Sequence, residues 1–124
     1  MCLRLFGAIS GRADAAGLAF RAGLDLRPDP RPIDRAAGAQ VLLVELSWGD
    51  CACALATSAD GGERLAVFAE GLFAAGARLQ LLLLDELDDP RFGSLPVNTV
   101  ALSTIRSQGL SALDRGAAAE VSEL

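Results

Sequence analysis

Hydrophobic and polar residues alternate over two stretches of the chain, as in β-strands whose two faces have different surroundings. The first stretch is residues 2–9, and the second is residues 97–105. In the first, one face carries Leu3, Leu5 and Ile9, and the other carries Cys2, Arg4, Phe6 and Ala8. The alternation in the second stretch predicts an edge strand.

Three other runs predict strands of a different kind. Residues 41–47 are apolar on both sides at first, and residues 51–57 follow after the turn-forming sequence Trp48-Gly49-Asp50, which together predict a hairpin. Residues 78–84 are apolar almost throughout, so this strand is expected to lie inside a sheet.

Two segments show the spacing of amphipathic helices. Residues 11–23 place alanine and leucine on one side, and Gly23 is positioned to end the helix. Residues 60–76 begin with Asp60 three positions before Glu63, which is a capping-box pattern, and continue with an apolar stripe.

The predicted order is therefore β-α-β-β-α-β with one further strand, in a single domain covering residues 1–124. This is the order of the ferredoxin-like α+β fold, in which two helices pack on one face of an antiparallel sheet. An open α/β sheet is the alternative, because residues 81–84 are apolar enough for a buried parallel strand.

Three segments are expected outside this framework. Residues 27–35 are rich in proline and predict a surface loop. Residues 85–96 begin with a run of carboxylates and predict an acidic loop, and residues 116–124 predict a frayed tail.

Composition excludes several classes of function. The net charge of −5 argues against nucleic acid and against an anionic membrane surface as partners. The chain has no histidine and no lysine, which rules out a Ser-His-Asp triad and a P-loop lysine within it. With three cysteines and no signal-peptide pattern, we expect a soluble cytoplasmic protein, and the Ala, Gly, Arg and Leu excess is typical of a GC-rich bacterium.

The cysteines are the main candidates for chemistry. Cys51 and Cys53, with Asp50 beside them and Cys2 as a third sulfur, could form a metal or redox site. Thiolates are soft donors, so the metal would be zinc or copper(I). The same residues also fit a packing role, because Leu55 shares their face of the predicted strand and buried cysteine behaves as a small hydrophobe.

The start Met1-Cys2-Leu3 and the later Gly49-Asp50-Cys51-Ala52-Cys53 resemble a group of small bacterial proteins without an established activity. Those proteins begin Met-Cys-Leu and carry a later Gly-Cys-x-Cys stretch, in full Gly-Cys-Gly-Cys-Gly-Phe. The resemblance implies that Cys2 and the Cys-x-Cys pair belong to one site. Here Asp50, Ala52 and Ala54 replace the glycines of that stretch.

The leading functional hypothesis is a non-catalytic association or regulatory module that acts as a homodimer. A sheet covered by helices on one face leaves the other face to be covered, and pairing is one way to cover it. Phe6 and Trp48 are the expected interface residues. The alternative is a thiolate metal-binding or redox protein, and no enzyme activity is indicated.

Overall fold

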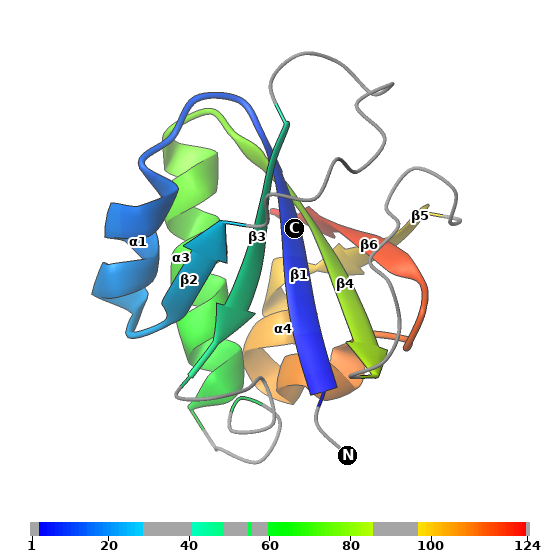
Figure 1. Cartoon of the computed structure of the whole chain (residues 1–124). Helices are drawn as coiled ribbons and strands as arrows, with labels where there is room; N and C mark the ends of the chain where they lie inside the picture. Colours follow the sequence, from blue (N-terminus) through cyan, green and yellow to red (C-terminus); the bar gives the residue numbers. More distant parts are fainter. Residues whose placement is uncertain (1–2, 29–40, 49–54, 56–59, 86–96, 124) are drawn as a thin grey trace.

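Strands and helices are arranged in two layers (Figure 1). The structure, a computed structural model of the chain, describes residues 3–28, 41–48, 55, 60–85 and 97–123. Its elements are β1 (Leu3–Ser10), α1 (Ala15–Ala22), β2 (Asp25–Pro28), β3 (Val41–Ser47), α3 (Gly61–Ala74), β4 (Arg78–Asp85), β5 (Val97–Ala101), α4 (Leu102–Gln108), the 3₁₀ turn η2 (Gly109–Ala112) and β6 (Ala118–Ser122).

The six strands form one mixed sheet in the order β2-β3-β1-β4-β6-β5. β1 lies between two antiparallel neighbours, with Leu5 opposite Leu46 of β3 and opposite Leu83 of β4. β5 and β6 are parallel to each other, and α4 with η2 connects them. The chain is therefore α+β, as predicted, and within the described residues β2 and β5 are the edge strands of the sheet.

The three helices of the described segments lie on one side of the sheet (Figure 1). Phe68 and Leu72 of α3 belong to the same buried cluster as Leu5, Ile9 and Leu81 of the central strands. The predicted covering of one sheet face by helices is confirmed. No helix in these segments has the length and apolar character required to cross a membrane.

The opposite face carries a smaller buried cluster, whose described members all belong to strands: Phe6, Ala8, Leu82, Leu84 and Ala118, with Leu43 packed against it. The alternation predicted for residues 2–9 is thus confirmed, since Phe6 and Leu5 belong to different clusters. Arg4 lies at the margin of this face, where its guanidinium binds the Glu45 carboxylate at 3.0 and 3.1 Å.

Two predicted strands are corrected by the structure. Leu55, the one described residue in the predicted strand 51–57, is helical and buried. β3 has β1 on one side and β2 on the other, and the other residues of the predicted hairpin partner 51–57 lie outside the described residues. The strand predicted at 97–105 ends at Ala101, and α4 begins at the next residue. The side chains at 102–105 fit the start of an amphipathic helix as well as a strand, so their pattern did not distinguish the two.

Two segments expected to lack regular structure contain strands. β2 takes up the beginning of the predicted loop 27–35, and its Pro28 is tolerated because β2 is an edge strand. The predicted tail 116–124 contains β6, which is held between β4 and β5. Ala118 and Val121 of β6 are buried, so tertiary pairing overrides the weak strand preference of alanine. Residues 29–35 and 86–96 lie outside the described part.

Gly61 and Gly62, at the start of α3, allow backbone from other parts of the chain to approach closely. A Cβ atom on Gly62 would lie 2.7 Å from the carbonyl oxygen of Arg106 in α4, and a Cβ on Gly61 would meet the Leu55 carbonyl group. Because these neighbours are backbone atoms, they cannot turn aside as a side chain can. The close contact between α3 and α4 is therefore possible because glycine has no side chain at this position.

We expect Gly62→Ala to lower the free energy of unfolding by about 2 kcal/mol, because the added methyl group overpacks the α3–α4 contact. In an exposed helix the same change would raise it by about 1 kcal/mol. Gly71→Ala is the matched control, since a Cβ on Gly71 meets only the movable side chain of Leu18. Urea unfolding of both variants tests this, and equal stabilities would contradict it.

Candidate functional site

The candidate site is an open pocket between β4 and β6, of about 410 Å³. These two strands pair at only two positions, Gln80 with Glu120 and Leu81 with Ala119. Continuing that register would place Arg78 opposite Ser122, but the pairing stops before them. Both residues instead line the pocket.

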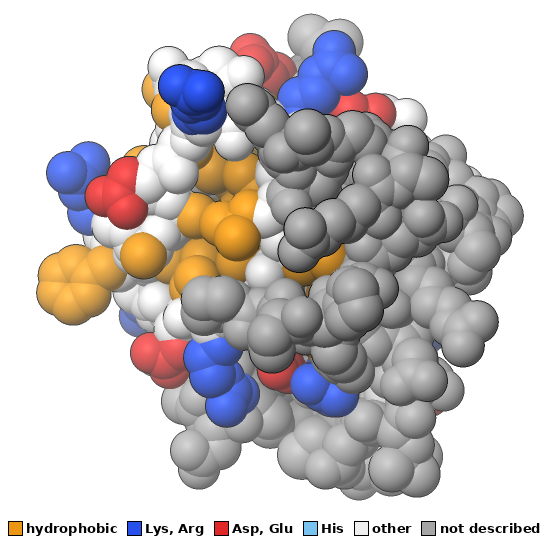
Figure 2. Space-filling view, turned by 45° about the horizontal axis from the view of Figure 1, so that its top comes forward, with side chains coloured by type: hydrophobic (Ala, Val, Ile, Leu, Met, Phe, Trp, Pro, Cys, Tyr) orange, Lys and Arg blue, Asp and Glu red, His pale blue; other side chains and the backbone are white. Residues whose placement is uncertain are grey.

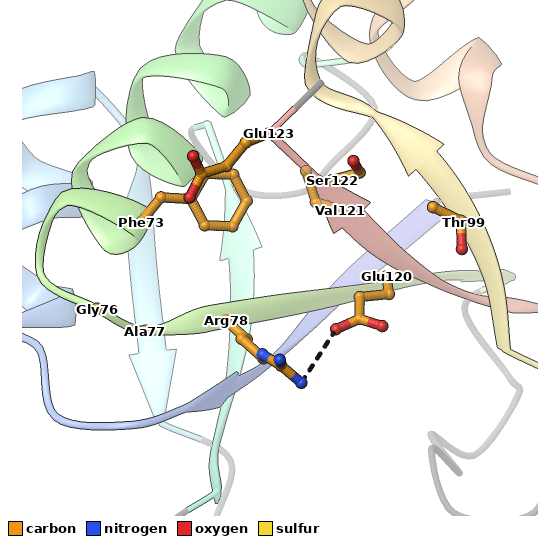
Figure 3. A pocket seen from close by; sticks show the side chains of 9 residues that line it. All are labelled: Phe73, Gly76, Ala77, Arg78, Thr99, Glu120, Val121, Ser122 and Glu123. Carbon is orange, nitrogen blue, oxygen red and sulfur yellow. Dashed lines mark ion pairs between the residues drawn. The ribbon is translucent and has the colours of Figure 1, made fainter.

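The pocket lining combines polar and apolar side chains (Figure 3). The guanidinium of Arg78 and the carboxylate of Glu120 point toward each other with 4.0 Å between Nη1 and Oε1. Glu123 and the hydroxyl-bearing Thr99 and Ser122 also line the pocket, and the ring of Phe73 from α3 supplies an apolar wall. Its side chains can therefore contact both charged and apolar groups.

The Arg78–Glu120 pair is weakly held. Its separation is at the upper limit for an ion pair, and the two side chains are 79% and 40% exposed. Such a pair contributes little to stability in water. The guanidinium thus keeps most of its hydrogen-bonding capacity for another partner.

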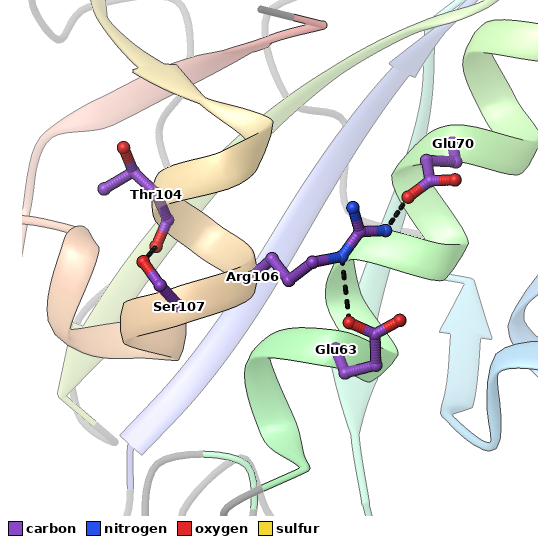
Figure 4. Close-up of polar contacts among 5 residues, drawn as sticks. All are labelled: Glu63, Glu70, Thr104, Arg106 and Ser107. Atoms are coloured by element: carbon purple, nitrogen blue, oxygen red, sulfur yellow. Dashed lines mark hydrogen bonds and ion pairs between the residues drawn. The ribbon is translucent and has the colours of Figure 1, made fainter.

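α3 and α4 are joined by a second polar cluster, which has a structural role (Figure 4). Nε of Arg106 donates to Glu63 at 2.8 Å, and Nη2 of Arg106 contacts Glu70. The hydroxyl of Ser107 donates to the Thr104 carbonyl at 3.2 Å. The Arg106 side chain thus extends from α4 to α3 and links the two helices. These five residues do not form a catalytic arrangement.

The two expected interface residues occupy different environments. Phe6 is only 1% exposed, so within the single chain it already belongs to the core. Trp48 is half-buried at the end of β3, and the Arg64 guanidinium lies 4.0 Å from its ring centroid. Neither side chain presents a large open surface.

Arg64 connects Trp48 to the end of α1. Its Nη1 donates to the carbonyl oxygens of Gly23 at 3.2 Å and Ala22 at 3.5 Å, which are groups that the helix leaves unpaired. Its Nε is buried and has no hydrogen-bond partner among the described residues. The stacking on Trp48 compensates in part for this loss of hydration.

The cysteine site predicted from the sequence lies outside the described residues: Cys2, Asp50, Cys51 and Cys53. Within the described ranges, no three His, Cys, Asp or Glu side chains are grouped so that they could hold a metal ion. A thiolate site for zinc or copper(I) stays a prediction.

Comparison with protein-family models, with curated proteins and with solved structures gives no match to this chain.

Sequence reasoning did not identify Arg64, Arg78 or Glu120. Arg64 directly precedes Leu65 at the border of the apolar stripe of α3, and this position is a signal that its stem would be partly buried. Arg78 and Glu120 gave no such signal, because they meet only through the pairing of β4 with β6.

We expect Arg64→Lys to lower the free energy of unfolding by about 1–2 kcal/mol, because a lysine cannot stack on Trp48 and bind two carbonyl groups together. Arg115→Lys is the control, since Arg115 forms an exposed pair with Asp85 and should contribute less than about 0.5 kcal/mol. Trp48 is the only tryptophan, so its fluorescence can follow unfolding in urea. Equal losses in the two variants would contradict the role assigned to Arg64.

Proposed function

We propose that the protein is a small non-catalytic association module that forms a homodimer through the outer edge of β5 and the adjoining surface of α4. The observation that carries this proposal is the difference between the two edges of the sheet, which β2 and β5 form.

The β2 edge has features that oppose pairing. β2 is four residues long, carries the exposed charges of Asp25 and Arg27, and ends in Pro28, which has no N–H to donate. Short length, charge and proline are the devices by which natural sheets protect an edge.

The β5 edge, five residues long, lacks the charges and the proline. Its sequence, Val-Asn-Thr-Val-Ala, is uncharged and free of proline, and Asn98 and Thr99 are exposed. In the described part of the chain, β6 is the only strand that pairs with β5. An edge of this kind is suited to accept another strand.

The neutral character extends beyond β5. Residues 97–113 contain one charged side chain, Arg106, whose guanidinium is bound by Glu63 and Glu70 of α3. In the whole chain 22% of residues are charged and the net charge is −5. Two identical acidic molecules repel each other, so a neutral surface favours a second copy of the chain as the partner.

An antiparallel pair of β5 strands around Thr99 would be compatible with two-fold symmetry. Thr99 would then face Thr99 of the second copy, and Asn98 would face Val100. Threonine pairs across strands are favourable, and no like charges meet. The sheets of two molecules would join into one.

For the fold, we propose that β1–α1–β2–β3–α3–β4 is a ferredoxin-like unit and that β5–α4–β6 is an addition to it. Support comes from the order β2-β3-β1-β4, from the antiparallel pairing of β1 on both sides, and from the position of α1 and α3 on one face.

We expect sedimentation velocity to show a concentration-dependent dimer, and Thr99→Lys to weaken dimerisation at least about tenfold, because two like charges would lie opposite each other at the edge. Ala16→Lys adds the same charge at an exposed position of α1, at the other end of the sheet from β5, and should leave the dimer intact. A monomer at all concentrations, or equal weakening by both variants, would overturn the proposal.

A further inference from the structure

The place where β4 and β6 separate is distinguished by its charges. It brings one guanidinium, that of Arg78, together with two carboxylates, those of Glu120 and Glu123, in one pocket. Seen with the top of Figure 1 turned forward, the molecule exposes apolar side chains with charged side chains around them (Figure 2).

We infer that this pocket binds a small zwitterion of the α-amino acid class. Arg78 would bind the ligand's carboxylate, and Glu120 and Glu123 would bind its ammonium group. The inference does not depend on dimerisation, because the lining residues named here belong to a single chain.

Arg78 has the properties of a carboxylate receptor. Its planar guanidinium can donate two parallel hydrogen bonds to one carboxylate. Its ion pair with Glu120 is 4.0 Å long, and its side chain is 79% exposed. A ligand carboxylate can therefore approach it without first breaking a short contact.

The two glutamates supply the complementary charge. With Arg78 they give the pocket a net charge of −1, so an anion alone is disfavoured and a ligand that also carries an amine is favoured. The ring of Phe73 lies against the same space and can contact an apolar side chain of the ligand. A volume of about 410 Å³ falls within the range of small-molecule sites.

The test is titration of the ¹⁵N-labelled full chain, followed by amide chemical shifts, with glycine, L-leucine and L-phenylalanine as probes. We expect at least one probe to produce saturable shifts centred on Arg78, Ser122 and Glu123. That probe's N-acetyl derivative lacks the ammonium group and its amide lacks the carboxylate, so each should bind at least about tenfold more weakly.

Two variants separate the roles of the charges. Arg78→Gln should weaken the amino acid about tenfold but should not weaken the amide, because the amide has no carboxylate to lose and its cation no longer meets the guanidinium charge. Glu120→Gln should weaken the amino acid but should not weaken the N-acetyl derivative, whose carboxylate is repelled by Glu120. Arg115→Gln is the control, since Arg115 pairs with Asp85 in a similarly exposed position but does not line the pocket.

Three results would overturn the inference. They are the absence of saturable shifts with all three amino acids, equal binding of the parent amino acid and its N-acetyl derivative, and equal weakening by Arg78→Gln and Arg115→Gln.

Discussion

The central position of β1 is the constraint on which the rest of the structure depends. β1 pairs along its whole length with β4, from Leu3 opposite Asp85 to Ser10 opposite Arg78, and β3 occupies its other side. Because side chains alternate along a strand, this pairing sends Leu5 toward the helices and Phe6 toward the opposite face. A shift by one residue would exchange the two clusters, so the register decides which surface α1 and α3 cover.

Among the described residues, the β5–α4–β6 segment joins this framework through two main contacts, besides the hydrogen bond from Gly116 to Leu83 and the Arg115–Asp85 pair. One is the short pairing of β6 with β4, and the other is the contact of α4 with the glycine-containing start of α3. Arg106 strengthens the second contact through Glu63 and Glu70. The pocket lies where the first contact ends. The pocket exists because β6 pairs with only part of β4. Its lining combines residues of the β1–β4 framework with residues of the β5–α4–β6 segment.

The sequence predicts well those elements whose own residues show the full hydrophobic pattern of a strand or a helix. The alternation in residues 2–9, the apolar run at 78–84 and the apolar stripe at 60–76 each correspond to an observed element, although Asp60 makes no side-chain capping hydrogen bond at the start of α3. β2 and β6 were missed because they are short and rich in proline or alanine, and only their neighbours in the sheet make them strands. Arg78 and Glu120 are 42 positions apart by their numbering, so their meeting follows from sheet pairing and from no local pattern.

The unequal edges of the sheet also limit the size of any assembly. A sheet with two open edges can add one molecule after another and grow into a fibre, whereas a sheet with one open edge is complete after a single addition. Asp25, Arg27 and Pro28 close the β2 edge, so strand pairing through β5 would stop at two copies. The proline and the exposed charges of β2 would then protect the protein against aggregation.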